Sequence, residues 1–314
     1  MDLSSTIVYA SGGFRRYDEA KVGLLTHGLQ YGTGCFEGIR GYWVPGDDEL
    51  YLVHLRDHYE RLGISAKILT MGFPESVDEL IEITIELCLR NRFRQDVYVR
   101  PFIYKSAEDI GVRLHNVADA LAVIPVPYAP YLDPNRGLDV CVSSWRRADD
   151  TMAPPRAKIT GLYVNSALAK SEAVQNGYDE AILLSHDGHV AEGSAENVFL
   201  VRRGVLYTPD PSQNVLEGVT RKIVMDVARD ELGLEIVERS IDRGELYAAE
   251  EIFFTGTAVG IAYVSSVDRR PVADRAIGPI TSALRDFYAR IVTAREPRWA
   301  DSVTRVYASA RVSA

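Results

Sequence analysis

A single lysine, Lys158, is the residue best suited to covalent chemistry. The chain has few lysines against many arginines, and this one stands in the loop sequence APPRAKITG. A lysine amine attacks a carbonyl carbon once burial or a neighbouring cation lowers its pKa, and an arginine cannot do so. A lone loop lysine is more often solvated, so the argument for chemistry depends on the residues around it.

Three further features suit a phosphorylated ligand. Residues 218–220, Gly-Val-Thr, begin a predicted helix, whose first backbone N–H groups and positive dipole end bind anions. Residues 255–257, Thr-Gly-Thr, end a predicted strand and are small enough for the backbone to approach an anion. Arg61 offers a forked guanidinium. A helix cap, a turn and a solvated arginine are the simpler explanations of the three.

Glu192 is an acidic residue in a short predicted strand, beside a glycine and next to an apolar run. A carboxylate in such surroundings needs a partner. One interpretation is a surface glutamate of a hairpin. The other is a counter-ion that keeps a ring nitrogen protonated, as the electron-sink chemistry of pyridoxal phosphate requires.

The elements that must position Lys158 are a strand and a helix. Residues 138–145 are rich in β-branched residues and predict a strand, which is followed by two consecutive prolines. Residues 165–175 predict a helix with Asn165 as its N-cap and Gly177 as its stop. Lys158 therefore lies in a strand-to-helix loop, a place where catalytic side chains collect.

In the rest of the chain, some stretches space their apolar residues as a helix does and others as a strand does. This mixture indicates an α/β fold of the mixed α+β kind. A capping box, Ser76 with Glu79, begins one of the helices. Strands are expected at residues 5–10, 35–44, 49–53, 97–104, 120–126 and 251–254 and in a hairpin at 180–200, and helices at 55–69, from 76, at 218–232 and at 280–293.

The length of 314 residues favours two domains. Four prolines crowd the segment PVPYAPYLDP, which predicts a linker without regular structure. We expect a smaller N-terminal α/β domain over residues 1–124, an interdomain loop over 125–136 and a larger C-terminal α/β domain over 137–314.

Composition excludes several classes of function. The net charge of −9 and a pI near 5.3 argue against a nucleic-acid surface. No apolar run approaches the length of a membrane span, and the N-terminus lacks the basic start of a signal peptide. Three widely spaced cysteines predict reduced thiols in a cytoplasmic protein. His54 and His58 are four apart, but no third metal ligand is evident, so no metal is expected.

The motifs carry a family resemblance. The segments AKITGLYVNSAL, AEGSAENVFL, EGVTR and FFTGTA resemble the class IV aminotransferases that use pyridoxal phosphate, and among them the branched-chain amino acid aminotransferase group. Upstream, HGLQYGTGCFEGIRGY, HYERL, VYVRP and VSSWRR match in order and spacing. The resemblance therefore covers nearly the whole chain.

The resemblance implies fold type IV, with two α/β domains, pyridoxal phosphate between them and a homodimer as the minimal unit. By position, Lys158 would form the Schiff base with the cofactor and shuttle the proton at the substrate Cα. Glu192 would hold the pyridine nitrogen protonated, and Tyr163 would bond to the phenolic oxygen. The phosphate ligands would be Arg61, Val219, Thr220 and Thr257.

The resemblance also implies a substrate pocket that takes an aliphatic and an acidic side chain in turn. Arg100 would bind the γ-carboxylate of glutamate or 2-oxoglutarate, because an arginine beside aromatic walls engages the acid and lets apolar groups pack. The other pocket residues would be Tyr31, Phe36, Tyr98, Tyr131 and Ala258. Branched-chain L-amino acids as donors and 2-oxoglutarate as acceptor are the expected substrates, in a ping-pong cycle.

Two positions depart from the family pattern. Arg113 is an additional candidate carboxylate ligand, in a loop that is usually glycine-rich, and Gly260 stands where a glutamate is commoner. They leave open a transaminase for D-amino acids or (R)-amines. An aminodeoxychorismate lyase of the same fold is a further alternative, and the simplest is a non-catalytic protein that binds a phosphorylated ligand.

Overall fold

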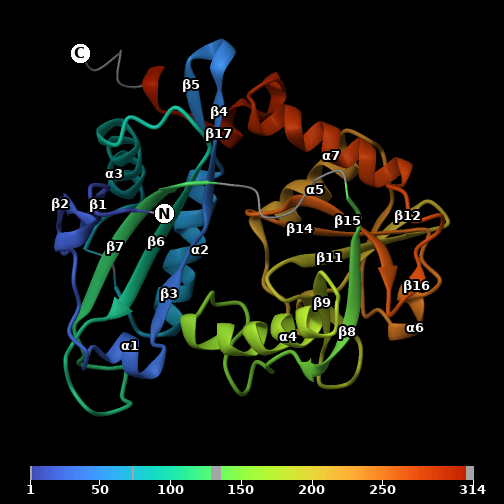
Figure 1. Cartoon of the computed structure of the whole chain (residues 1–314), viewed down its shortest axis with the longest axis horizontal. Helices are drawn as coiled ribbons and strands as arrows, with labels where there is room; N and C mark the ends of the chain where they lie inside the picture. Colours follow the sequence, from blue (N-terminus) through green and yellow to red (C-terminus); the bar gives the residue numbers. More distant parts are fainter. Residues whose placement is uncertain (1, 73, 129–135, 309–314) are drawn as a thin grey trace. The chain divides into compact units, whose positions relative to one another are not determined.

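The structure is a computed structural model that describes residues 2–72, 74–128 and 136–308 of the chain. It divides into two compact units (Figure 1). Unit 1 comprises Met1–Ala129, Ala157–Gly161 and Arg290–Ala314, and unit 2 comprises Pro130–Arg156 and Leu162–Ala289. Two segments expected in the C-terminal domain, the one around Lys158 and the C-terminal one, thus belong to unit 1. The predicted boundaries stay a prediction, because residues 129–135 lie outside the described residues.

Unit 1 is built on an eight-stranded sheet whose pairs are all antiparallel. Its order is β17-β5-β4-β6-β7-β1-β2, and β3 also pairs with β6. Helix α2 packs on β3 and on α3, and α3 packs on β1 and β7. The bounds are β1 Ile7–Ala10, β2 Gly13–Arg16, β3 Gly34–Phe36, β4 Ile39–Val44, β5 Glu49–Val53, β6 Val97–Lys105, β7 Asp119–Pro127, β17 Val303–Arg305, α1 His27–Tyr31, α2 Leu55–Ile68 and α3 Val77–Arg90.

Strand β6 shows why the site residues of unit 1 share one face. Buried and half-buried residues alternate along it without a break. Successive side chains of a strand point to opposite faces, so Val97 and Val99 enter the core while Tyr98 and Arg100 point to the other side. The alternation thereby places a tyrosine and an arginine side by side.

Helix α3 begins as the sequence predicts. The hydroxyl of Ser76 accepts the backbone N–H of Glu79, and the Glu79 carboxylate accepts the backbone N–H of Ser76 at 2.6 Å. The expected capping box is confirmed.

The prediction that the proline-rich segment has no regular structure is wrong at its start. Pro125 and Pro127 lie in β7, opposite Val99 and Val97 of β6. On its other side β7 pairs with β1 only at Ala122 and Val123. A proline has no N–H to donate, so a strand tolerates it where no neighbouring strand needs that hydrogen bond. Pro125 and Pro127 lie beyond the part of β7 that pairs with β1, which meets this condition.

Unit 2 is built on a mixed sheet of order β10-β9-β8-β15-β14-β11-β12-β13, with β16 paired to β15. Strand β8 runs parallel to β9, and α4 connects them and packs on both. Its bounds are β8 Leu138–Arg146, β9 Glu180–Leu184, β10 Val190–Gly193, β11 Asn197–Arg202, β12 Val205–Thr208, β13 Ile236–Glu238, β14 Glu251–Gly256, β15 Gly260–Val267, β16 Arg270–Pro271, α4 Tyr163–Gln175, α5 Val219–Asp230, α6 Arg243–Leu246 and α7 Pro279–Val292, the last of which ends in unit 1.

Two predictions within unit 2 are corrected. Helix α4 begins at Tyr163, and Asn165 is not its N-cap. The Asn165 amide instead accepts the N–H of Ala148 and donates to the carbonyl of Arg146. The expected long hairpin strand is also interrupted after Gly193, because β10 pairs with β9 whereas β11 pairs with β14. Gly177, with a φ of 72°, ends α4 as predicted.

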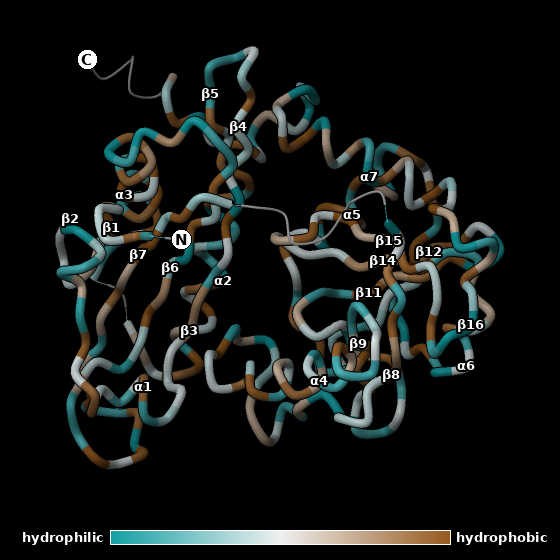
Figure 2. The backbone as a smooth tube through the Cα atoms, in the orientation of Figure 1, coloured by the Kyte–Doolittle hydropathy of each residue, from teal (hydrophilic) through white to brown (hydrophobic). Residues whose placement is uncertain are grey.

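Apolar residues are distributed unevenly over unit 1. The α1 segment and the loop after β6 carry exposed leucine, isoleucine and valine side chains. Figure 2, which colours the backbone by hydropathy, shows hydrophobic stretches in this part of unit 1. These two segments are neighbours, since the N–H of His27 donates to the carbonyl of Ala107 at 2.9 Å. None of the helices in the described residues has the length and hydrophobicity needed to cross a membrane.

Candidate active site

The loop between β8 and α4 carries Lys158, as the sequence predicts, and its central segment is bound to unit 1. The N–H of Lys158 donates to Oγ of Ser65 at 3.1 Å, and its carbonyl accepts the N–H of Phe36 at 3.1 Å. An isolated antiparallel bridge joins Ile159 to Cys35. The backbone of Lys158 is therefore held on both sides.

The side chain of Lys158 is half-buried and lies near an aromatic ring. Its Nζ is 5.2 Å from the centroid of the Phe36 ring. The guanidinium carbon of Arg100 is 4.3 Å from the same centroid, and Nη2 of Arg100 donates to the hydroxyl of Tyr98 at 3.1 Å. Four residues singled out from the sequence thus meet around one ring, with an amine, a guanidinium and an aromatic wall.

The glycine after Glu37 is required by this wall. A Cβ atom on Gly38 would lie 1.9 Å from the hydroxyl of Tyr98. A Cβ atom at that distance would displace the Tyr98 ring, so Gly38 leaves room for the position that Tyr98 occupies.

The aromatic wall extends further than the sequence indicated. Tyr98 stacks on Tyr128 with 6.4 Å between ring centroids, and the guanidinium carbon of Arg40 lies 3.6 Å from the Tyr128 centroid. Arg40 is in turn paired with Asp96 at 2.9 Å. The stacking geometry depends on strands that are far apart in the sequence, and no local signal reveals it.

Arg61, a predicted phosphate ligand, lies in a buried ionic cluster. Its Nε and Nη2 donate to the two carboxylate oxygens of Glu37 at 2.6 and 2.8 Å, and Nδ1 of His58 lies 2.7 Å from Oε2 of Glu37. Burial alone would raise the pKa of Glu37, but the adjacent Arg61 and His58 lower it well below its ordinary range. Burial lowers the pKa of His58. Glu37 is therefore an anion, and the orientation of the Arg61 guanidinium is fixed by a forked pair of bonds.

Two other substrate residues predicted in unit 1 lie in α1 and in the loop between β6 and β7. Tyr31 is in α1, and its hydroxyl accepts the N–H of Gly111 at 3.2 Å. Arg113 is exposed in the loop between β6 and β7. Tyr131 lies outside the described residues.

In unit 2, Glu192 of β10 has the partners that a buried carboxylate needs. Oε1 lies 2.8 Å from Nε of Arg147, while Oε2 accepts Nδ2 of Asn197 at 3.1 Å and the N–H of Leu216 at 3.0 Å. Sequence reasoning missed Arg147 and Asn197. The paired arginines in VSSWRR were the available signal for the first of them.

The start of α5 presents backbone donors. Gly218 is its N-cap and supplies no side-chain bond to the first turn, which includes Val219 and Thr220. A Cβ atom on Gly218 would lie 2.1 Å from Oδ1 of Asn197, so the helix start packs closely on β11. Amides without a side-chain cap and the positive end of the helix dipole suit an anion.

A second feature beside α5 also suits an anionic ligand. The hydroxyl of Thr255 is buried and has no hydrogen-bond partner among the described residues. Thr255 is opposite Asn197 in the β11–β14 ladder, so the two side chains share one face. Together with the uncapped amides, this hydroxyl would suit an anionic group such as a phosphate at this end of unit 2.

The remaining predicted residues of unit 2 lie at element ends. Tyr163 is the first residue of α4 and is half-buried. Thr257 and Ala258 are in the turn between β14 and β15. Gly260, which follows this turn, has a φ of 64°, and that left-handed conformation explains the glycine without reference to substrate handedness.

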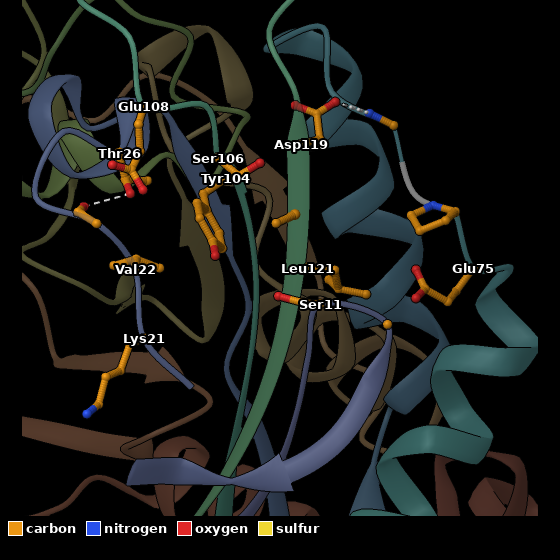
Figure 3. A pocket seen from close by; sticks show the side chains of 15 residues that line it. Ser11, Lys21, Val22, Thr26, Glu75, Tyr104, Ser106, Glu108, Asp119 and Leu121 are labelled. Carbon is orange, nitrogen blue, oxygen red and sulfur yellow. Dashed lines mark hydrogen bonds between the residues drawn. The ribbon is translucent and has the colours of Figure 1, made fainter. Parts of the chain in front are cut away.

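A cavity of about 490 Å³ lies elsewhere in unit 1 (Figure 3). Lys21, Glu75, Tyr104, Glu108 and Asp119 are among its lining residues, and none of the predicted site residues lines it. Two carboxylates there have partners, since Glu75 accepts the hydroxyl of Tyr9 and Asp119 pairs with Lys105. The size of this cavity is therefore no guide to the chemistry around Lys158.

Comparison with known proteins decides the family. Residues 34–267 match the family model described as amino-transferase class IV. This chain belongs to the class IV aminotransferases. The match extends from β3 to the end of β15 and so includes Lys158, Glu192 and the α5 start.

Individual relatives of this class IV aminotransferase are similar over nearly their whole length. A probable branched-chain-amino-acid aminotransferase of Aquifex aeolicus is 42% identical over 305 residues, which cover 97% of this chain and 98% of the relative. The crystal structure of a branched-chain aminotransferase from Thermoproteus uzoniensis with norvaline has a TM-score of 0.92 and 43% identity, and covers 96% of this chain and 100% of its own.

A third similar protein is the branched-chain amino acid aminotransferase from Thermobaculum terrenum, whose crystal structure is in the PLP-form (holo-form). It has a TM-score of 0.92 and 38% identity, and covers 97% of this chain and 99% of its own. These similarities confirm the expected mixed α/β fold of type IV, with its two sheets.

Proposed function

We propose that this class IV aminotransferase uses pyridoxal 5'-phosphate to transfer the amino group of L-leucine, L-isoleucine or L-valine to 2-oxoglutarate. The observation that carries the proposal is the cluster around Phe36, where the Lys158 amine and the Arg100 guanidinium lie against one ring. The names of the similar proteins, which act on branched-chain amino acids, support the same substrates.

The donors of the chain fit the cofactor. Lys158 would hold it covalently through its amine, and Glu192 would face the ring nitrogen. The buried hydroxyl of Thr255 and the α5 amides provide the anion site that its phosphate needs. The residues proposed to complete the binding are Arg61 for the phosphate from unit 1, and Tyr163, Val219, Thr220 and Thr257 from unit 2.

When bound, pyridoxal phosphate supplies the electron sink that stabilises negative charge at the substrate Cα and carries the nitrogen between the two substrates. Lys158 would remove the proton from the substrate Cα as a general base and would return a proton as a general acid. Glu192 would hold a proton on the ring nitrogen, and its carboxylate is oriented for this role by Arg147 and two N–H donors.

The pocket must accept apolar and acidic side chains alternately. Phe36 and Tyr98 provide an aromatic wall on which an aliphatic chain packs, and Arg100 stands at its edge with its Nη2 on the Tyr98 hydroxyl. An acid pairs with the guanidinium, whereas an aliphatic chain leaves Arg100 on the ring faces. Tyr31, Arg113, Tyr131 and Ala258 are proposed as further pocket residues.

We also propose a homodimer that is built through the exposed apolar side of unit 1. Leu24, Ile110 and Val112 are 82%, 79% and 76% exposed, and Leu25 and Leu29 lie beside them. An apolar group of this extent is typical of a surface that binds another chain. A cytoplasmic location is supported by three cysteines that are all free and buried, as in proteins of reducing compartments.

The test is a transamination assay of the cofactor-loaded protein with L-leucine and 2-oxoglutarate. We expect glutamate to form, and we expect Lys158→Ala to lack both the absorption band of the lysine-bound cofactor and the activity. Lys67→Ala, at an exposed lysine of α2, is the control and should match the parent. Turnover confined to D-alanine or (R)-1-phenylethylamine, or pyruvate formed from aminodeoxychorismate, would contradict the proposal.

A further inference from the structure

The backbone of Lys158 depends on two anchors from different elements of unit 1. Phe36 at the end of β3 donates its N–H to the Lys158 carbonyl, and Ser65 on α2 accepts the Lys158 N–H. Ser65 is fully buried, so its hydroxyl cannot exchange this bond for one to water. The position of the lysine therefore depends on the spacing between β3 and α2.

Each anchor lies close in the chain to a member of the buried ionic cluster. Glu37 directly follows Phe36, and Arg61 and His58 precede Ser65 by four and seven residues on α2. Residues at this helical spacing lie on one face, so the side of α2 that binds Lys158 also binds Glu37. The three bonds of the fully buried Glu37 carboxylate thus join the two elements at the point where both contact Lys158.

A purely stabilising role explains this arrangement poorly. A buried ion pair costs desolvation free energy that often equals its attraction, and apolar residues of similar volume frequently give the same stability. What ion pairs provide better is one fixed geometry, because the forked Arg61–carboxylate bond tolerates little displacement.

We infer that Glu37 is a positioning residue for Lys158: by binding Arg61 and His58 it sets the spacing of Phe36 and Ser65, and so the place from which the lysine amine acts. The same bonds orient the Arg61 guanidinium. The role in catalysis rests on the proposed function, whereas the effect on the Lys158 backbone does not.

The test compares Glu37→Gln with Glu49→Gln in the cofactor-free protein. Glu49 is a matched control, a buried glutamate of the same unit that accepts the N–H groups of Val306, Tyr307 and Ala308. Hydrogen-exchange mass spectrometry would follow the peptide with residues 157–161 and the peptides of β7. Ser65→Ala removes one anchor directly and is the milder variant if Glu37→Gln folds poorly.

We expect Glu37→Gln and Ser65→Ala to speed exchange in residues 157–161 by about tenfold, the size of one lost hydrogen bond. In both variants, the exchange rate of β7 should stay as in the parent. Glu49→Gln should instead raise the exchange rate of residues 306–308 and leave that of residues 157–161 unchanged. Exchange that rises equally over all of unit 1, or not at all in residues 157–161, would overturn the inference.

A second readout separates this inference from the proposed function. In the loaded protein, Glu37→Gln should lower kcat more than it raises KM and should shift the absorption band of the lysine-bound cofactor. Failure of the parent to bind pyridoxal phosphate would refute the function, and the exchange result would still decide the role of Glu37.

Discussion

Arg147 and Glu192 form a buried ion pair, with 2.8 Å between Nε and Oε1 and less than a tenth of either side chain exposed. Arg147 directly follows β8 and Glu192 is in β10. The pair therefore links the two strands that flank β9 in the sheet. The Glu192 carboxylate thus has a cation and two N–H donors as partners, as a buried carboxylate needs.

Replacing Arg147 with methionine should leave a buried charge without its cation. We expect the free energy of unfolding to drop by about 3–5 kcal/mol and the transamination rate to fall, since Glu192 loses the buried partner that orients it. Arg156→Met removes a pair with Glu217 in which both side chains are about half exposed, and it should cost less than about 1 kcal/mol. Urea unfolding of both variants checks this, and equal small losses would contradict the importance of the Arg147 pair.

Arg100 should discriminate between the two substrate classes. In Arg100→Met we expect KM for 2-oxoglutarate to rise about 10- to 100-fold, the effect of one lost charge-assisted hydrogen bond, while KM for L-leucine changes little. Methionine keeps apolar contact with Phe36, so the aliphatic substrate loses little packing. Arg113→Met is the comparison, and a larger effect there would transfer the acid-binding role to Arg113.

Stability should fall in two steps as the pH decreases. Burial lowers the pKa of His58 below its ordinary 6.5, so the unfolded chain takes up a proton first and stability declines from about pH 6.5 downwards. Burial would raise the pKa of Glu37, but Arg61 and His58 lower it well below 4.5, so a second loss begins below about pH 4.5.

Melting temperatures between about pH 8 and pH 2 check both steps. His58→Asn, which keeps an N–H donor beside Glu37, should lack the first step, and Glu37→Gln should have a flatter curve below about pH 4.5. Curves that run parallel to that of the parent would show that these two groups do not control the pH dependence.

The three cysteines should resist modification in the folded protein. Burial raises the pKa of Cys35 and of Cys88 to about 12 and that of Cys141 to about 11. The reactive thiolate is then scarce at pH 8, and access is blocked as well. Titration with a thiol reagent should find almost no reactive thiol in the native protein and three in denaturant, and rapid reaction of one thiol in the native protein would contradict the burial.

Local sequence signals predicted local features well. The Ser76 capping box and the Gly177 stop depend on residues that are neighbours in the chain, and local composition predicted that Lys158 lies between a strand and a helix; the structure confirms all three. Asn165 was assigned wrongly because its side chain bonds to Arg146 and Ala148, and a residue favoured at helix starts was taken for a cap.

Long-range partners could not be predicted in the same way. The anchor of Lys158 on Ser65 spans 93 residues in the chain, and Arg40 of β4 contacts Tyr128, the residue after β7, only once the sheet has formed. The roles of Lys158, Glu192 and the phosphate ligands were predicted from a family resemblance. They remain proposals for binding and loss-of-function measurements to decide.

The division of the chain has a consequence for synthesis on the ribosome. Unit 1 receives Ala157–Gly161 from between two stretches of unit 2, and its edge strand β17 is made from Val303–Arg305. Contacts between segments that are distant in the chain slow folding, and they cannot form until the later segment has been synthesised. A nascent chain therefore cannot complete the unit that contains Lys158 before residues 303–305 have emerged, and a product that terminates earlier lacks an edge strand of the sheet in that unit.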